Sequence, residues 1–281
     1  MLAAIKDLLR PAYNGSPAAR LMSRWRRRPA AFAREQAAYM RAHATAASPL
    51  QAGDPYLAKL VADGFVVIPN LHAAEQIAAL REQIHDIAER VRRGERNPAW
   101  DLLTYEEDGI YRIRGIERIV PEARPLLDHP VPNELARRYL RTGSFRTVGN
   151  YVDFKPDLVH DYTTVPHLDS WKSQIKVFTP LADVGEENAP FVYWAGSHRD
   201  GEWRRPFDYA MWSGDYIGSG GVVPPHVLRD AAASGNPLAP RETTVTAPAG
   251  SVIVADTRGV HRASNLRAGY RLQIVQKFTI A

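Results

Sequence analysis

Apolar residues recur at steps of three and four positions in the first half of the chain, a spacing that predicts amphipathic helices. The clearest helix is expected over residues 73–93. Its apolar face consists of Ile77, Leu80, Ile84, Ile87 and Val91. A shorter helix ends at Asp63-Gly64 and leads into an apolar strand over residues 65–69, and two more short helices are expected at residues 122–127 and 132–141. The long helix should cover one face of a sheet.

The pattern changes after residue 143 to short strand-like runs separated by turns rich in Gly, Pro and Asn. The expected strands are residues 145–154, 173–180, 191–194, 251–255 and 270–279. Helices first and many strands later are typical of a mainly β, α+β protein whose helices flank one side of a barrel or jelly roll. We therefore expect one large domain over residues 51–281.

Residues 1–50 form a different region, rich in alanine and arginine and interrupted by prolines. The whole chain has a formal net charge of +5, but nine Lys or Arg residues face only two acids in these fifty positions. Without this basic arm the chain is slightly acidic, which argues against nucleic-acid binding by its body. Two interpretations of the arm remain: short helices packed on the domain or on a partner subunit, or peripheral docking on an anionic membrane surface.

Composition excludes several classes of protein. A hydrophobic fraction of 45% and a charged fraction of 24% are ordinary for a globular chain. The absence of cysteine excludes disulfides, thiolate-bound zinc, iron–sulfur clusters and thiol nucleophiles, so any metal must be held by His and carboxylates. The first residues carry an acid where the apolar core of a signal peptide would lie, so we expect a cytoplasmic protein.

A candidate metal site begins at His167-Leu168-Asp169. The carboxylate follows the imidazole by two positions, so both leave the same face of an extended segment. His261 follows an apolar strand and can supply a third ligand. Two His and one carboxylate leave open coordination positions, as Fe(II) oxygen chemistry requires. A second triplet, His198-Arg199-Asp200, offers the same pair of ligand types, so spacing alone does not decide between the two.

A 2-oxo acid could chelate such an iron through two oxygens and leave a position for O2. The distal carboxylate of 2-oxoglutarate then needs its own anchor, and a planar guanidinium can meet it with two parallel hydrogen bonds. Arg271 stands ten residues after His261 at the start of the next strand. Arg267 is the alternative, but it falls inside a turn and should face solvent.

Together these motifs resemble the phytanoyl-CoA dioxygenase family of Fe(II)/2-oxoglutarate oxygenases from about residue 57 to the end. The similar segments are residues 63–69, 154–156, 167–169, 181–188, 195–198 and 248–271. The resemblance implies a double-stranded β-helix fold, iron held by His167, Asp169 and His261, and oxoglutarate held by Arg271. It also implies that His198 belongs to a structural turn.

The chain departs from the family pattern near the cosubstrate. Leu272-Gln273 follows Arg271 where the family has a small hydroxyl residue. We consider Gln174, Asn150 and Trp194 as further contributors to oxoglutarate binding. Related halogenating enzymes replace the carboxylate ligand by a small residue, so Asp169 favours hydroxylation.

The expected reaction is hydroxylation of a C–H bond in a small molecule or conjugated metabolite, with release of succinate and CO2. The alternatives are desaturation, cyclisation or epimerisation with the same cofactors, and a non-catalytic β-barrel binding protein. The irregular stretch over residues 200–241 is a candidate substrate lid, or else a surface insertion. Its candidate lid residues are Trp203, Trp212 and Tyr216. Arginines in and near this stretch would suit an acidic substrate, although solvation accounts for them equally well.

Overall fold

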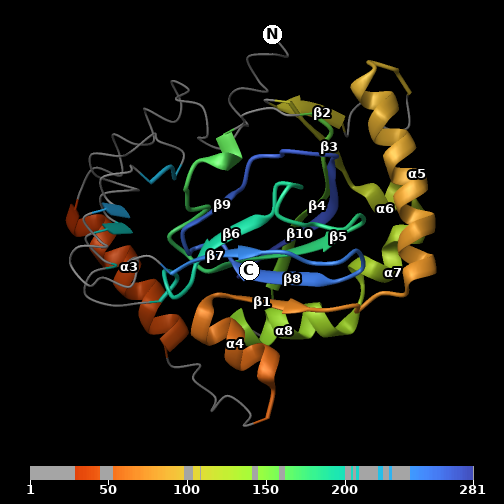
Figure 1. Cartoon of the computed structure of the whole chain (residues 1–281). Coiled ribbons are helices and arrows are strands. Elements are labelled where there is room, and N and C mark those ends of the chain that lie inside the picture. Colours follow the sequence, from red (N-terminus) through yellow and green to blue (C-terminus); the bar gives the residue numbers. More distant parts are fainter. Residues whose placement is uncertain are drawn as a thin grey trace.

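The computed structural model shows two antiparallel β-sheets that face each other, with helices on the outside (Figure 1). The described residues are 29–44, 53–97, 104–107, 109–140, 145–157, 162–199, 204, 207–208, 221–223, 228–229 and 241–280. This arrangement confirms the expected mainly β core with flanking helices, and it agrees with the jelly-roll architecture that the resemblance implies.

The larger sheet has seven strands, and all its neighbouring strands are antiparallel. In spatial order they are β1 (Phe65–Ile68), β8 (Val252–Asp256), β5 (Gln174–Pro180), β10 (Arg271–Ile280), β4 (Phe145–Lys155), β3 (Ile110–Arg114) and β2 (Thr104–Glu107). The last strand of the chain, β10, lies at the centre and pairs with β4 on one side and β5 on the other. The centre of the sheet therefore joins segments that are far apart in the sequence.

The smaller sheet has three strands in the order β7 (Glu242–Val245), β6 (Phe191–Trp194) and β9 (His261–Ala263). It is extended beyond β9 by bridges from His167 to His261 and from His167 to Val222. The segment around residue 167 therefore acts as a further strand at the edge of this sheet.

Helices cover the outer face of the larger sheet (Figure 1). They are α4 (Pro55–Asp63), α5 (Ala74–Arg92), α6 (Ile116–Ile119), α7 (Arg124–Leu127) and α8 (Pro130–Leu140), with 3-10 turns η1 (Pro121–Ala123) and η2 (Tyr162–Thr164). Asp54 caps α4 by accepting hydrogen bonds from the first backbone N–H groups of the helix. Gly64 ends the helix with φ +88°, and a Cβ there would collide with the buried Tyr193 hydroxyl, so only glycine fits.

The strand alternation divides the apolar residues between two layers. Outward-facing side chains of the large sheet, such as Val152 and Ile274, pack with Leu80 and Ile84 of α5. Inward-facing residues pack between the sheets and include Val275. From Arg271 to Lys277 of β10, the odd-numbered positions thus face the interior and the even-numbered positions face the helices.

The predicted strands and helices of the domain agree with the observed bounds within a few residues. The sequence pattern did not predict β2, β3, β7 or β9. β9 has only three residues, and the hairpin of β2 and β3 carries charged side chains on both strands, so neither shows a clear apolar alternation. Pairing with neighbouring strands decides these elements.

The described part of the basic arm is helix α3 (Pro29–Ala44), which packs against the domain. Ser173 N donates to the Tyr39 hydroxyl at 2.9 Å, and the Tyr39 ring contacts Trp171 edge-on at 5.4 Å. Gln36 Nε2 donates to the buried Asp208 at 3.0 Å. α3 thus agrees with the interpretation of a helix packed on the domain, while the boundary at residue 50 and the membrane contact stay predictions. Residues 1–28 and 45–52 lie outside the described residues.

Among the helices that the structure describes, none is both long and apolar enough to cross a membrane.

Replacing Leu80 by alanine should destabilise the fold, because its side chain is fully buried between α5 and the sheet. A Leu→Ala change at such a site costs about 2–5 kcal/mol in the free energy of unfolding. Denaturant-induced unfolding measures the loss. The exposed Glu82 on the same helix is the control, and Glu82→Ala should change the unfolding free energy by less than about 0.5 kcal/mol. Equal effects of the two changes would contradict the assignment of the buried face.

Candidate functional site

Three side chains converge in the interior at the edge of the smaller sheet. Ligand atoms of His167, Asp169 and His261 all lie within 4.8 Å of one another. The backbones of His167 and His261 exchange hydrogen bonds of 2.9 and 3.0 Å, and Asp169 N donates to Thr257 O at 3.0 Å. Leu168 is buried in a separate apolar cluster, so the first and third residues of the triplet share one face. The structure therefore brings together the three predicted metal ligands, hereafter the triad.

Backbone carbonyls orient both imidazoles of the triad. His167 Nδ1 lies 2.8 Å from Val165 O, and His261 Nδ1 lies 2.9 Å from Gly259 O. A carbonyl oxygen can only accept, so Nδ1 carries the proton in each neutral ring and Nε2 keeps its lone pair. Burial and the neighbouring His167 lower the pKa of His261 to about 3, so its imidazole is neutral near pH 7. This tautomer is the one that binds a metal through Nε2.

Two buried atoms of the triad make no hydrogen bond to the described residues. His261 Nε2 is one of them. Asp169 Oδ2 is the other, although the Lys176 ammonium lies 2.7 Å from it in an ion pair. Unsatisfied buried polar atoms are uncommon in folded proteins, and a bound ion is one way to satisfy them. The residues present therefore fit a metal ion, and their two-nitrogen, one-carboxylate set suits iron with open positions for further ligands.

Asp169 is held in its ionised form by nearby cations. Burial alone would raise the pKa of Asp169, but the ammonium groups of Lys176 and Lys277 hold it well below its usual range. Lys176 is the strongest of these influences, in keeping with its direct contact to the carboxylate. The carboxylate is thus ready to bind a cation without first losing a proton.

Arg271 lies in a buried polar cluster on the same inward face of the large sheet. Its Nη2 donates to Asp153 Oδ2 at 2.8 Å and its Nη1 donates to Ala189 O at 2.8 Å, while Nε is buried without a hydrogen-bond partner among the described residues. Asp153 also accepts hydrogen bonds from Arg112 at 3.3 Å and from Gln273 at 3.2 Å. Burial would raise the pKa of Asp153, but Arg271 and Arg112 hold it below its ordinary value. Two guanidinium groups therefore share one carboxylate.

The other expected cosubstrate residues lie on different faces. Gln174 alternates with Lys176 on β5, so both point to the interior, and Gln174 accepts hydrogen bonds from the Thr257 hydroxyl. Asn150 alternates with the inward-facing residues of β4, and Trp194 packs on the outer side of the smaller sheet. The structure thus brings Gln174 to the side of the triad and turns Asn150 and Trp194 away from it. Trp203, Trp212 and Tyr216 lie outside the described residues.

The competing triplet occupies a structural position. His198 is buried in the turn after β6, and its Nε2 lies 3.1 Å from Val61 O at the end of α4. Asp200 lies outside the described residues. Arg267, the alternative to Arg271, has a side chain that is 67% exposed beside Glu187. Both placements agree with the predictions for a turn histidine and a solvent-facing arginine.

Four polar residues near these clusters were not predicted from the sequence: Asp153, Lys176, Gln273 and Lys277. All four lie on the inward faces of their strands. Gln273 and Lys277 lie two and six residues after Arg271 on β10, and Asp153 and Lys176 lie opposite Gln273 and Lys277 on the neighbouring strands. Alternation from Arg271 would have indicated Gln273 and Lys277. Asp153 and Lys176 need the strand register, which the sequence pattern does not show.

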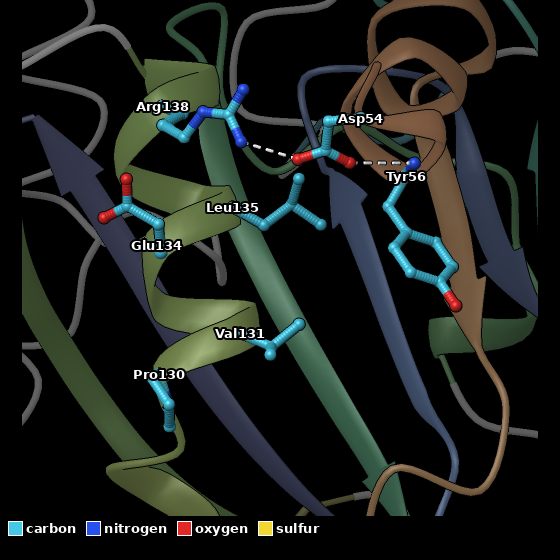
Figure 2. Close-up of a pocket in the computed structure, with 7 residues that line it drawn as sticks. All are labelled: Asp54, Tyr56, Pro130, Val131, Glu134, Leu135 and Arg138. Carbon is cyan, nitrogen blue, oxygen red and sulfur yellow. Dashed lines mark hydrogen bonds and ion pairs between the residues drawn. The ribbon is translucent and has the colours of Figure 1, made fainter. Parts of the chain in front are cut away.

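A separate surface groove lies between the start of α4 and α8 (Figure 2). It has a volume of about 290 Å³, and Arg138 Nη1 crosses it to Asp54 Oδ2 at 2.6 Å. Leu135 in its lining belongs to the apolar cluster on the helix-covered face of the large sheet. The groove therefore lies on the opposite face of the sheet from the triad and contains none of its residues.

Two facing antiparallel sheets that enclose two histidines and one carboxylate define a class, the non-haem iron oxygenases. The sequence profile of the phytanoyl-CoA dioxygenase (PhyH) family matches residues 60–270. The chain therefore belongs to this family of Fe(II)- and 2-oxoglutarate-dependent oxygenases. It is a non-haem iron dioxygenase that uses 2-oxoglutarate and O2. A search of curated protein sequences gave no match.

Solved structures share the fold at low sequence identity. Iron-bound EctD from S. alaskensis has a TM-score of 0.60 and 18% identity over 80% of this chain and 75% of its own. The epimerase SnoN, in complex with Fe3+, alpha ketoglutarate and nogalamycin RO, has a TM-score of 0.56 and 21% identity over 80% and 82%. HygX from Streptomyces hygroscopicus, with nickel, 2-oxoglutarate and hygromycin B bound, has a TM-score of 0.54 and 16% identity over 80% and 86%.

Replacing His167 by alanine should abolish stoichiometric binding of Fe(II), because it removes one of three ligands while leaving the fold intact. His198→Ala is the matched control, since this buried histidine contacts the end of α4 and lies outside the triad. Iron content after anaerobic loading and desalting gives the measurement. Full iron occupancy in His167→Ala, with loss in His198→Ala, would show that the metal binds the other triplet.

Proposed function

We propose that His167, Asp169 and His261 bind Fe(II), that Arg271 binds the distal carboxylate of 2-oxoglutarate, and that the enzyme hydroxylates a C–H bond of a small-molecule substrate. The observation that carries the proposal is the buried triad, whose His261 Nε2 and Asp169 Oδ2 make no hydrogen bond to the described residues. A metal ion bound by these two atoms would satisfy them, and a two-histidine, one-carboxylate set leaves open positions for 2-oxoglutarate and O2.

When bound, iron with 2-oxoglutarate and O2 supplies the oxidant for an unactivated C–H bond. One oxygen atom enters the substrate as a hydroxyl group, and the other enters succinate as CO2 leaves. The protein positions the ligands through the carbonyls of Val165 and Gly259, which fix both imidazoles. Aromatic rings pack beside the imidazoles and exclude water there. The Phe191 ring centroid lies 5.6 Å from that of His261 and 5.1 Å from that of Phe178.

The charge of the Arg271 cluster supports its role as the cosubstrate anchor. Arg112 and Arg271 are two buried guanidinium groups that contact the same carboxylate, Asp153. Cationic surroundings of this kind favour a carboxylate ligand such as the distal carboxylate of 2-oxoglutarate. Asp153 holds the Arg271 guanidinium in one orientation, and the buried Nε remains available as a donor.

The outcome of the reaction rests on the metal ligands. Asp169 occupies the carboxylate position that halogenating relatives leave vacant, which supports hydroxylation. The structural neighbours include an epimerase and a carbocyclase, so epimerisation and cyclisation are the alternative outcomes with the same cofactors. Neighbours crystallised with nogalamycin RO or hygromycin B support a small-molecule substrate. A cytoplasmic location stays a prediction from the sequence.

Anaerobic addition of 2-oxoglutarate to the Fe(II)-loaded protein tests the proposal. A weak visible charge-transfer band should appear as the 2-oxo acid chelates the iron, and His167→Ala should not show it. Substrate-independent consumption of O2 with release of succinate then reports turnover. A wild-type protein that binds Fe(II) but shows neither the band nor succinate would refute the proposal.

Arg271→Ala should weaken 2-oxoglutarate binding to the iron-loaded protein by roughly two orders of magnitude or more, because breaking a buried charge pair costs about 3 to 5 kcal/mol. Arg271→Lys should restore only part of the affinity, since an ammonium cannot reproduce the two-pronged contact. The exposed Arg267 gives the matched control, and Arg267→Ala should bind normally. Titration of the charge-transfer band measures all three. Unchanged 2-oxoglutarate affinity in Arg271→Ala would contradict the assignment of Arg271 as the anchor, without affecting the assignment of the iron ligands.

A further inference from the structure

Two lysines lie side by side next to the triad, and the proposed chemistry uses neither as a ligand. Lys176 of β5 and Lys277 of β10 are directly opposite each other in the register of the large sheet. Lys176 Nζ contacts Asp169 at 2.7 Å, and Lys277 is close enough to both Asp169 and Lys176 for their charges to interact. Lys277 also shares the inward face of Val275. Both ammonium groups therefore face the interior beside the proposed iron.

Directly opposed like charges destabilise a sheet, so this pair needs a compensating anion. Asp169 compensates Lys176. Among the described residues, no carboxylate lies within ion-pair distance of Lys277, although its side chain is partly buried. A partly buried ammonium without a counter-ion is unfavourable. The imbalance grows when Asp169 binds a divalent cation, because its negative charge is then shared with the metal.

Open space adjoins Lys277 on its other side. Its partner on β4 is Gly149, and a Cβ built there would meet no described atom within 4 Å. Gly149 lies two residues before Tyr151, on the same inward face. Among the described residues, no atom therefore occupies the position next to Lys277 on this side.

The oxoglutarate anchor belongs to the other end of β10. On β4, Lys155 lies opposite Arg271 and Gly149 lies opposite Lys277. Arg271 and Lys277 are six residues apart on β10, so their Cα atoms are separated by roughly 20 Å along the strand. If Arg271 binds the distal carboxylate of 2-oxoglutarate, only its other carboxylate, next to the 2-oxo group, lies near the triad. That carboxylate and Asp169 would both bind the iron, so neither would serve Lys277 as a dedicated counter-ion.

We propose that Lys277, with Lys176 beside it, is an anion-binding subsite for the substrate, and that the substrate carries a carboxylate or phosphate group held next to the iron. The inference rests on the proposed function, because it takes the triad to be the reacting centre. It names the class of substrate as an acidic small molecule and gives the residue that recognises its charge.

Inorganic phosphate and acetate are the probes, added separately to protein loaded with Ni(II) and saturating 2-oxoglutarate. The thermal unfolding midpoint is followed at constant ionic strength, with chloride as the reference anion. The wild type should show a saturable rise with at least one probe. Lys277→Met should weaken that response at least tenfold, whereas Lys277→Arg should keep it. A response to acetate alone indicates a carboxylate substrate, and a response to phosphate alone indicates a phosphate ester.

Lys59→Met is the matched control, because Lys59 is a 51% exposed lysine paired with Asp63 on α4. It should respond as the wild type does. An equal response in Lys277→Met and wild type, or no saturable response of the wild type to either probe, would overturn the subsite. So would a tenfold loss of 2-oxoglutarate affinity in Lys277→Met with the anion response unchanged, because that result assigns the lysine to the cosubstrate.

The charge-transfer band separates this inference from the proposed function. A band of equal intensity in wild type and Lys277→Met establishes the iron and oxoglutarate site, and the anion response then judges the subsite alone. Absence of the band in the wild type refutes the proposed function whatever the anion response is. Circular dichroism of Lys277→Met and Lys277→Arg confirms folding, and the Arg variant keeps the test valid should the Met variant fail to fold.

Discussion

The hydrogen bonds that the backbones of His167 and His261 exchange hold together the two segments that carry the metal ligands. They align the triplet beside β9, so His167 and Asp169 point inward with His261. The carbonyls of Val165 and Gly259 belong to these same segments and fix the imidazole tautomers. Without this pairing the three ligands would belong to separate loops. Backbone pairing at the edge of the smaller sheet thus holds the three ligands in place before a metal binds.

The interior between the sheets is organised by charge as well as by apolar packing. Near one end of β10, Asp153 lies between Arg112 and Arg271, and near the other end Asp169 lies close to Lys176 and Lys277. In each cluster one carboxylate meets two cations. This arrangement supports the proposed binding of a dicarboxylate cosubstrate and an acidic substrate.

A third acid between two cations shows what a purely structural cluster looks like. Asp208 is fully buried and accepts hydrogen bonds from Arg204, Arg258 and Gln36. Arg204 uses all three of its nitrogens, because Nη1 and Nη2 donate to the carbonyls of Ser197 and Arg258. This cluster joins α3 to the turns next to the triad. By contrast, the Arg271 cluster lies on the inward face of the large sheet, the face that also carries Lys176 beside the triad.

Local pattern determined much of this protein. The helix over residues 73–93, the six predicted strands and the α+β class follow from apolar periodicity, and His167, Asp169 and His261 follow from ligand chemistry together with the family resemblance. Tertiary structure decided what depends on pairing between distant segments. The three-residue strand β9, the position of Asp153 beside Arg271, and the opposition of Lys176 and Lys277 all depend on strand register. The physical reason is that alternation along one strand tells which residues share a face, whereas hydrogen bonds between strands decide which residues meet across it.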